Sequence, residues 1–275
     1  MVSDSEDPND DEQYHLAIGP GDVAESVLLP GNPERVDAIT ESWEDAVEQA
    51  YHREYRTVTG SYDGTPISVT STGIGSPSAA IAVEELARVG SETFIRVGST
   101  GAIQPEMSVG DLVITTGAVR QEGTSDEYVR PDYPAVADRE VVGALVAAAE
   151  ELDYDYHVGI TMSADSFYAG QGRPGYDDYR APGSESLVSD LRSANVKNIE
   201  MEASAILTLA NLYDRRAGAV CSVYANRTTG EFRSTGDEKA AETANLAVSI
   251  LDRMDEAKEA EGVDHWHPGL TIEDT

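Results

Sequence analysis

The chain alternates strands and helices around the segment from residue 93 to residue 115, and this order constrains its fold more than any other feature. An apolar run opens that segment, and a helical pattern over 78–89 precedes it. A further strand ends at Ser71, so the order is strand, helix, strand. Two strands joined by a crossover helix in this way are expected to be parallel, with a right-handed crossover. The sequence therefore predicts an α/β fold with parallel strands at its centre.

An arginine interrupts this apolar run just before a glycine-rich turn. Phe94, Ile95 and Val97 are typical of a buried strand. Arg96 stands among them and needs a partner for its charge. The turn Gly98-Ser99-Thr100-Gly101 lets the backbone approach a ligand, and its hydroxyls and N–H groups can bind oxyanions. Two interpretations remain open: a phosphate-sized site at the end of the strand, or an edge-strand arginine that reaches water.

The chain is strongly acidic, which narrows the classes of partner that it can have. It has 51 Asp and Glu against 19 Lys and Arg, and its formal net charge is -32. This charge repels nucleic acids and anionic membranes, so we expect no partner of either kind. The acid is spread along the whole chain, a pattern typical of a halophilic proteome in which salt screens the repulsion. The alternative is an acidic surface that binds a partner protein.

Length and composition predict one α/β domain over 14–261. The chain has 275 residues, and 40% of them are hydrophobic. We expect a disordered acidic tail over 1–13 and a loose tail over 262–275. Residues 1–11 are acidic and polar, unlike a signal peptide, and no apolar run approaches the roughly 20 residues of a membrane span. A cytoplasmic protein is expected, with the single Cys221 in its core.

Other segments have recognisable turn and capping signals. Asp63-Gly64 lies between two β-rich runs over 51–71 and predicts a hairpin. Ser76 is expected to cap the helix that follows, with Pro77 in its first turn and Gly90 after its end. Further strands are expected at 27–29, 113–119, 157–163 and 217–225, a long loop at 120–137, and helices at 138–152, 203–213 and 237–261.

Polar or charged residues follow several of the expected strands. Gly31 and Arg35 follow the first strand, Phe167, Gln171 and Arg173 follow another, Met201 and Glu202 open a helix, and Arg227 follows the last strand. At one edge of a sheet these groups would form a site for an anion, a sugar and a planar ring. Each segment has a plainer interpretation as well, as an ordinary loop with a solvated arginine or as a helix start that favours glutamate.

Seven motifs in this order resemble those of the nucleoside phosphorylase-I family, over nearly the whole chain. They are LPGNPERV, HREY, STGIGSPS, RVGSTGAIQPEMSVGD, FYAGQGR, EMEAS and NRT. The resemblance implies a single three-layer α/β/α domain with a mixed, partly barrel-like central sheet. It implies a pentosyltransferase that cleaves a nucleoside with phosphate as a substrate, without a required cofactor, and it is strongest to members that act on uridine. It also implies a homo-oligomer, expected to be a hexamer built from dimers.

The resemblance further implies a role for each matching residue. Phosphate would be bound by Gly31, Arg35, Arg96 and Ser99, with Arg53 reaching in from a neighbouring subunit. Ribose would be bound by Met201 and Glu202, with His15 from that neighbour. The base would be bound by Phe167, Gln171, Arg173 and Tyr224, with Arg227 close by. Arg96, Glu202, Arg173 and Arg227 would serve catalysis. Glu54, Ile74 and Ser78 match positions that bind a monovalent cation such as K⁺ in some members, and packing is an equally good interpretation of them.

The chain departs from the pattern of the uridine-cleaving members at three positions. Ser99 replaces threonine, Ala169 replaces proline, and Tyr224 stands where a small aliphatic residue is usual. Purine-specific relatives use an aspartate to protonate the base, and the segment 223–228 has no carboxylate, which favours a pyrimidine. Guanosine remains the alternative substrate. A nucleosidase that uses water and a nucleoside-binding protein without turnover are the alternative functions.

Overall fold

The computed structural model describes residues 12–270 as one α/β body built on a ten-stranded mixed sheet. Its strands are β1 (Ser26–Pro30), β2 (Glu44–His52), β3 (Tyr55–Tyr62), β4 (Thr65–Thr70), β5 (Thr93–Ala102), β6 (Leu112–Gln121), β7 (Ala135–Val136), β8 (Tyr156–Ala164), β9 (Val196–Glu200) and β10 (Arg216–Asn226). Its α-helices are α1 (Arg35–Thr40), α2 (Ser76–Arg88), α3 (Arg139–Glu151), α4 (Leu187–Ser193), α5 (Ala203–Leu212) and α6 (Asp237–Glu261). Short 3₁₀ turns lie at Ser125–Glu127, Ala169–Gln171 and Tyr176–Asp178.

Five strands close into a barrel at the centre of the sheet. The strand order β10-β6-β8-β9-β5 returns to its start, because β10 also pairs with β5 in parallel over its whole length. On the other side of β5, strands β1, β4, β3 and β2 extend the sheet away from the barrel. The expected mixed, partly barrel-like sheet is confirmed, with β5 as the strand that belongs to both parts.

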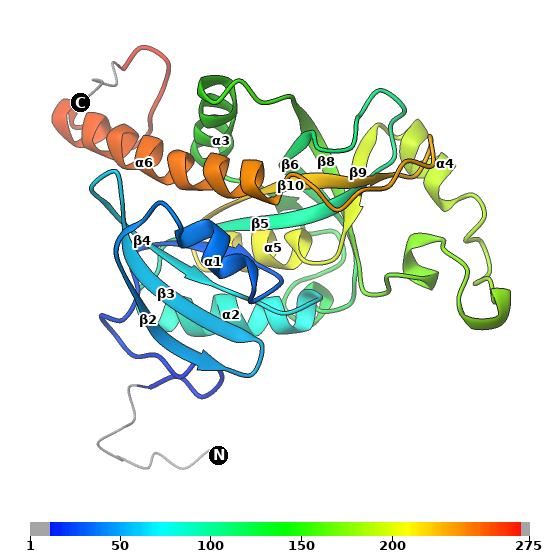
Figure 1. Cartoon of the computed structure of the whole chain (residues 1–275), viewed down its shortest axis with the longest axis horizontal. Coiled ribbons are helices and arrows are strands. Elements are labelled where there is room, and N and C mark those ends of the chain that lie inside the picture. The colour runs from blue at the N-terminus through cyan, green and yellow to red at the C-terminus, as the bar shows by residue number, and fades with distance from the viewer. Residues whose placement is uncertain (1–11, 271–275) are drawn as a thin grey trace.

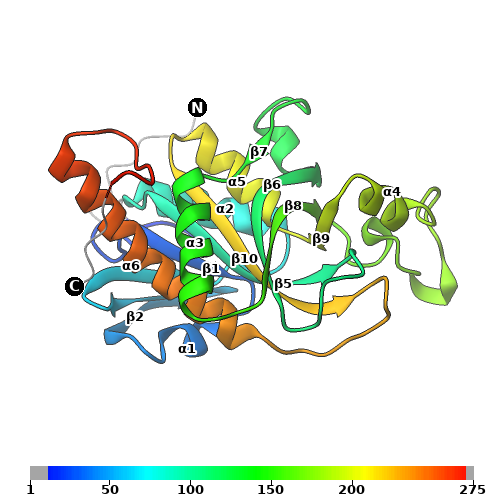
Figure 2. The same cartoon turned by 90° about the horizontal axis from the view of Figure 1, so that it is seen from above.

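Helices cover both faces of the sheet and complete three layers. Figure 1 shows α3 and α6 along one face and α2 along the other, and Figure 2 shows α3 and α6 from above. Side chains of β1 and β5 alternate between the two layers, as the pleat of a strand requires. Leu28, Ile95 and Val97 face α6, whereas Leu29 and Phe94 face α2 and α5. The strands are therefore buried on both faces, which explains their continuous apolar sequences.

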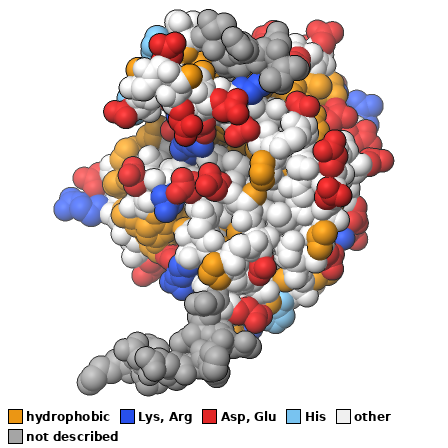
Figure 3. All heavy atoms as spheres, turned by 90° about the vertical axis from the view of Figure 1, so that its left-hand side faces the viewer, with side chains coloured by type: hydrophobic (Ala, Val, Ile, Leu, Met, Phe, Trp, Pro, Cys, Tyr) orange, Lys and Arg blue, Asp and Glu red, His pale blue; other side chains and the backbone are white. Residues whose placement is uncertain are grey.

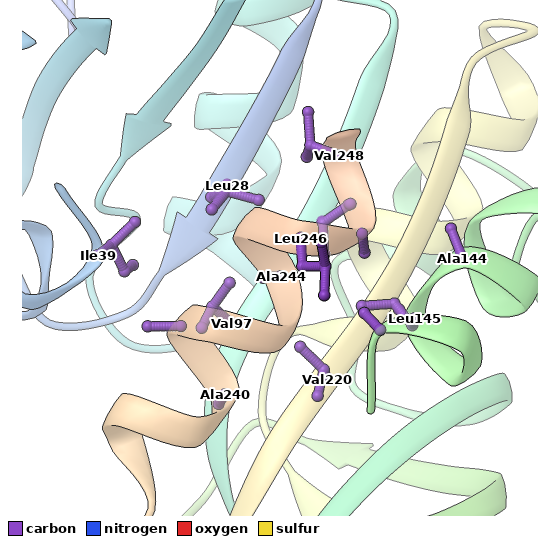
Figure 4. Packing of buried hydrophobic residues seen from close by; sticks show 14 of the residues in the cluster. Leu28, Ile39, Val97, Ala144, Leu145, Val220, Ala240, Ala244, Leu246 and Val248 are labelled. Atoms are coloured by element: carbon purple, nitrogen blue, oxygen red, sulfur yellow. The ribbon is translucent and has the colours of Figure 1, made fainter. Parts of the chain in front are cut away.

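The layer between the barrel and α6 is packed with small and branched side chains. Figure 4 shows Val97 and Val220, on the paired strands β5 and β10, facing Ala244 of α6. All three are at most 3% exposed. Because the alanine side chain is small, α6 can pack closely on β5 and β10. This close packing positions the first residues of α6 relative to the end of β5.

Most of the elements expected from the sequence are present. The crossover from β4 through α2 to β5 is a parallel unit, with β1 inserted between its two strands. The Asp63-Gly64 hairpin joins β3 to β4, and both turn residues have positive φ. Asp138 caps α3 by accepting hydrogen bonds from the backbone N–H groups of Glu140 and Val141. Helix α6 has the expected bounds.

Three local features differ from the expectation. The residue that caps α2 is Gly75, with φ of 97°, because the hydroxyl of Ser76 donates to the carbonyl oxygen of Met201 at 2.9 Å instead. Strand β2 starts at Glu44 in a segment without apolar alternation, and its side chains are almost all exposed. Helix α4 is a short surface helix with no buried residue. Strand β2 has no hydrophobic pattern from which it could be predicted, and α4 has a short one, Leu187, Val188 and Leu191, which pack partly buried on the barrel.

The expected tails lie partly outside the described residues, and the domain boundaries stay a prediction. Beyond α6, the backbone N–H of Trp266 donates to Glu140 at 2.9 Å, and its ring packs on the layer that contains α3. Cys221 is fully buried, as expected. No helix within residues 12–270 is long and apolar enough to cross a membrane.

Candidate active site

The carboxyl ends of β1, β5, β9 and β10 border a cavity of about 600 Å³. It is lined by Gly31, Asn32, Pro33, Arg35, Gly73, Ile74, Arg96, Ser99, Thr100, Gly101, Phe167, Gln171, Arg173, Ile199, Glu200, Met201, Glu202, Tyr224, Ala225 and Phe232. Eleven of the sixteen candidate site residues named from the sequence line this cavity, and a twelfth, Arg227, donates a hydrogen bond to the lining residue Gln171. Strands β1, β5 and β10 are parallel, so their carboxyl ends meet at one edge. Strand β9 is antiparallel to β5 and reaches this edge because it pairs with β5 only at Gly101 and Ala102.

A buried cluster of one arginine and two glutamates lies at the floor of the cavity. Arg96 Nε donates to Glu200 at 2.7 Å, and its Nη2 pairs with Glu202. The side chains of all three are at most 5% exposed. Arg96 is therefore the bridge between the strand β5 and the start of α5. Its Nη1 is buried without a hydrogen-bond partner among the described residues, so one donor of the guanidinium is left for a ligand.

Backbone and side-chain donors fix the two carboxylates of this cluster. Glu200 accepts the backbone N–H groups of Glu202 and Ala203 at 2.8 and 2.9 Å, and the hydroxyl of Ser163 also donates to it. Glu202 accepts the N–H of Gly75 at 2.6 Å, at the start of α2. Burial, together with the neighbouring charge of Glu200, raises the pKa of Glu202 to about 7, although Arg96 acts in the opposite direction.

A pair of arginines, Arg173 and Arg227, lies together in another part of the cavity region. The guanidinium of Arg173 is 4.4 Å from the centre of the Phe167 ring, and Arg227 donates to the backbone carbonyl of Gln171. Burial and the adjacent positive charge of Arg173 lower the pKa of Arg227 to about 10, and burial lowers the pKa of Arg173. Two cations side by side without a carboxylate favour an electron-rich ligand.

Gly101 leaves the space that this arginine pair occupies. A Cβ atom at Gly101 would lie 3.3 Å from Cδ of Arg227 and 3.7 Å from Nη2 of Arg173. The side chain of Gln171 is 97% buried beside them, whereas Phe167 is half exposed at the mouth. A planar ring that enters here meets an aromatic face, an amide and two guanidinium groups.

Arg35 occupies the side of the cavity nearest α1 and α6. Its Nη2 donates to the hydroxyl of Tyr224 at 2.9 Å and lies 3.3 Å from Asp237. Gly31 precedes it in a turn that approaches Gly73 closely, because a Cβ at Gly31 would lie 3.1 Å from the carbonyl oxygen of Gly73. The sequence predicted a turn at residues 98–101, but these residues continue β5 as far as Ala102, because they pair with β10. Arg35, Arg96 and Ser99 line the same cavity and supply cations and a hydroxyl.

Two candidate residues lie outside the cavity of their own chain. Arg53 is exposed, with φ of 57°, and its guanidinium is 5.5 Å from the ring of Tyr14. His15 Nδ1 lies 2.6 Å from Glu85, a buried carboxylate that also accepts two backbone N–H groups. Neither lines the cavity. Their contribution to a neighbouring subunit's site stays a prediction.

The three residues expected at a cation site lie close together around Gly73. A Cβ at Gly73 would lie 2.9 Å from Glu54 and 3.3 Å from Ser78 Oγ, and that hydroxyl donates to the carbonyl of Ile74 at 3.4 Å. Within residues 12–270 no cluster of three or more His, Cys, Asp or Glu could hold a metal. Cation binding at this position stays a prediction.

Among the residues of the cavity region that were not candidates from the sequence, three have contacts or positions that shape the site. Glu200 pairs with Arg96, Asp237 pairs with Arg35, and Phe232 covers part of the wall while 75% exposed. The only signal for Glu200 is its place in EMEAS beside Glu202. Asp237 reads as an ordinary first-turn acid of a helix, and its partner is 202 positions away in the chain.

Comparisons with known proteins agree with this arrangement. Residues 25–252 match the model of the phosphorylase superfamily. The chain is 61% identical to a uridine phosphorylase of Thermococcus kodakarensis, over 94% of this chain and 93% of the relative. It is 44% identical to a guanosine phosphorylase of Halorubrum lacusprofundi (87% and 96%) and 41% identical to a uridine phosphorylase of Escherichia coli (86% and 94%).

Proposed function

The chain belongs to the phosphorylase superfamily, and we propose that it cleaves uridine with phosphate to give uracil and ribose 1-phosphate. The observation that carries this proposal is the division of one cavity into three parts. Its lining includes Arg35, Arg96 and Ser99 as one group, Met201 and Glu202, which pairs with Arg96, as a second, and Gln171, Arg173 and Phe167 as a third. These groups suit phosphate, ribose and a pyrimidine in turn.

Phosphate is positioned as a nucleophile by the arginines. Arg96 is fixed by Glu200 and Glu202, so the direction in which its Nη1 can donate is preorganised before phosphate enters. The cation of Arg35 and the hydroxyl of Ser99 border the same region. Phosphate bound between them lies next to the ribose position beside Glu202, and the reaction becomes effectively intramolecular.

Cleavage is assisted at the opposite end of the nucleoside. As the C–N bond breaks, the sugar becomes oxocarbenium-like and the departing uracil gains negative charge. Arg173 and Arg227 are partly desolvated cations, and in a site closed to water they stabilise that charge more than they stabilise neutral substrate. Glu202 orients the ribose hydroxyls. No residue has to donate a proton to the base.

Guanosine is the second candidate substrate, because a guanosine phosphorylase is 44% identical to this chain. The six-membered ring of guanine has a carbonyl beside an N–H, as uracil has. The higher identity, 61%, is to a uridine phosphorylase, and no Asp or Glu lies between Val223 and Thr228 to protonate a purine. Uridine is therefore the preferred proposal.

The test is incubation with phosphate and each of uridine, thymidine, cytidine, inosine, guanosine and adenosine, with ribose 1-phosphate quantified. We expect the highest kcat/KM with uridine. Cytidine should be poor, because its amino group faces a donor, which costs about 1–3 kcal/mol. A tenfold preference for guanosine would reject the uridine assignment and keep the reaction class.

The same incubation separates the other functions. Equal cleavage with and without phosphate would identify a nucleosidase, and binding of nucleosides without any product would identify a binding protein. A nucleosidase is disfavoured, because a water nucleophile needs neither Arg35 nor Arg96. A binding protein without turnover is disfavoured, because every arginine and carboxylate of the motif set is present.

We propose that the active form is a homo-oligomer, a hexamer of three dimers, in which His15 and Arg53 complete a neighbour's site. Both residues lie outside their own cavity, on the side of the chain that includes exposed Tyr14 and Tyr51. Light scattering in high salt together with activity tests this proposal. A stable monomer with full activity would remove both residues from the site.

We also propose that a K⁺ ion binds at Glu54, Ile74 and Ser78. A comparison of activity in KCl with activity in choline chloride tests this proposal.

A further inference from the structure

Arg35 has two protein partners that come from distant parts of the chain. Its Nη2 donates to Tyr224 Oη at 2.9 Å and lies 3.3 Å from Asp237 Oδ1. The hydroxyl of Tyr224 in turn donates to Asp237 Oδ2. We call these three residues the Arg35 clamp. Arg35 is the first residue of α1, Tyr224 lies in β10, and Asp237 is the first residue of α6.

The hydrogen-bond directions in the clamp are determined by its chemistry. A phenol has one donor and can accept as well, a guanidinium only donates, and a carboxylate only accepts. The Tyr224 proton therefore goes to Asp237, and its oxygen receives an N–H of Arg35. Burial raises the pKa of Tyr224, and the bond to Asp237 raises it further, so the phenol stays protonated at neutral pH.

The clamp fixes only one nitrogen of the guanidinium. Nε, Nη1 and the second hydrogen of Nη2 make no hydrogen bond to the described residues, while the side chain lines the cavity and is 17% exposed. A planar guanidinium that is fixed at one corner keeps a fork of donors in a defined direction, and such a fork matches two oxygens of a phosphate.

We propose that Tyr224 and Asp237 are positioning residues that orient Arg35 toward the phosphate of the reaction. The inference rests on the proposed function, since it assigns the anion that Arg35 binds. It also removes Tyr224 from base recognition through its hydroxyl, because that hydroxyl is already used by Arg35 and Asp237. The tyrosine acts on the nucleophile side, although its position in the sequence suggests the base.

A purely structural role for these residues predicts different behaviour. Helices α1 and α6 are joined independently of the clamp, because the side-chain amide of Asn245 donates to the carbonyl of Ile39 at 2.8 Å and accepts from Trp43 at 3.0 Å. Loss of the Tyr224 hydroxyl should therefore leave α1 in place. Only the direction of Arg35 should change.

The experiment compares wild type with Tyr224→Phe by calorimetric titration with inorganic phosphate and by steady-state kinetics. We expect the Kd and KM for phosphate to rise roughly tenfold, as for loss of a hydrogen bond to a charged group. The KM for uridine and the ratio of uridine to guanosine activity should each change by less than twofold. The Tm should change by less than about 2 °C. Tyr176→Phe is the matched control, because Tyr176 is 98% exposed and lies outside the cavity.

A phosphate Kd that is unchanged in Tyr224→Phe, or a changed base preference with normal phosphate binding, would overturn the inference. A double-mutant cycle gives a second test. Tyr224→Phe should weaken phosphate binding by a smaller factor in an Asp237→Ala background than in wild type, whatever effect Asp237→Ala has by itself. Equal costs in both backgrounds would also overturn it. If wild type binds phosphate but cleaves no nucleoside, the proposed function fails while the binding comparison still tests the clamp.

Discussion

At the scale of single residues, the site depends on a buried excess of negative charge. Arg96 offers one positive charge to two carboxylates, Glu200 and Glu202, in a region closed to solvent. Glu200 accepts two backbone N–H groups, whereas Glu202 accepts one, and burial raises the pKa of Glu202 to about 7. The protein therefore keeps Glu202 in an unfavourable state near neutral pH, as is common for functional carboxylates.

Glu202→Gln should lower activity and raise stability in alkaline buffer. The amide keeps an oxygen for the N–H of Gly75 but binds ribose hydroxyls less well, so kcat/KM for uridine should fall at least ~10²-fold. In the folded wild type the pKa of Glu202 is about 7, above the ordinary glutamate value of 4.5. Protonation thus stabilises the fold fully below the lower value, and this stabilisation is lost as the pH rises to about 7.

The measurement for this variant is Tm from pH 5 to pH 8 beside wild type. The Tm difference, variant minus wild type, should increase with pH across that window, because glutamine does not ionise. Glu185→Gln is a control on an exposed glutamate that makes no ion pair within the described residues. A difference that decreases with pH would contradict the raised pKa.

The arginine pair at the base end gives the second prediction. Arg173→Ala should lower kcat/KM for uridine by about 10²–10³, as for removal of one donor that stabilises a developing charge, and should leave phosphate affinity unchanged. Titration with phosphate and initial-rate kinetics separate the two effects. Arg180→Ala is the control, because Arg180 is on the surface and paired with Asp178 at 3.4 Å. A loss of phosphate binding in Arg173→Ala would place this arginine at the other end of the cavity.

The sequence allowed many of these residues to be proposed, but not their pairings. Gln171 follows β8 and Glu202 precedes α5, whereas Arg96 is a charged residue inside the apolar strand β5, and all three line the cavity. The pairing of Tyr224 with Arg35 joins residues 189 positions apart, and nothing local in either segment indicates it. Local patterns indicate which side chains can do chemistry, whereas partners are determined by the closure of the barrel.

At the scale of elements, the end of β5 has no space for another side chain. A Cβ at Gly98 would lie 2.8 Å from Nη2 and 2.9 Å from Cζ of Arg96, and 2.9 Å from Cys221 Sγ on β10. The parallel pairing of β5 with β10 brings that sulfur opposite the glycine. The glycine therefore permits the barrel to close around a buried arginine.

Gly98→Ala should displace Arg96 and lower activity, with loss of at least ~1 kcal/mol of stability from overpacking. Gly143→Ala is a matched control in α3, where an added Cβ meets nothing within 4 Å, and it should raise stability by roughly 0.5–1 kcal/mol. Urea unfolding and uridine cleavage measure both variants. Full activity in Gly98→Ala would show that the Arg96 position tolerates a shift.

Elements were predictable where burial imposes a pattern. Strands β5, β8 and β10 and helices α3 and α6 bury apolar residues at strand or helix spacing. Strand β2 is held by its pairing with β3 on an exposed face, so its sequence has no such pattern. The closure of β5 on β10 is a long-range event that local sequence does not specify.

At the scale of the whole molecule, the surface is dominated by carboxylates. Figure 3 shows acidic side chains spread over one face, with fewer basic ones among them. With 51 acidic residues and 19 Lys and Arg, most carboxylates have no cationic partner. Some carboxylates accept hydrogen bonds from tyrosine hydroxyls instead, as Glu150 does from Tyr156 at 2.5 Å. Repulsion among the remainder opposes the compact state in dilute buffer.

Salt should therefore stabilise this protein, although it weakens the ion pairs that do exist. Exposed ion pairs contribute only about 0–1 kcal/mol each, and they are far fewer than the carboxylates without partners. At about 1 M salt the Debye length is roughly 3 Å, so repulsion across the surface is screened. The apparent Tm should rise by at least about 10 °C between ~0.1 M and ~3 M KCl, and activity should rise with it.

A variant with Glu106, Glu185, Glu256 and Glu259 changed to Gln is the matched control, because these exposed carboxylates make no ion pair within the described residues. Its Tm should depend less on salt than that of wild type. A wild-type Tm that is flat or falls with KCl would contradict the halophilic interpretation.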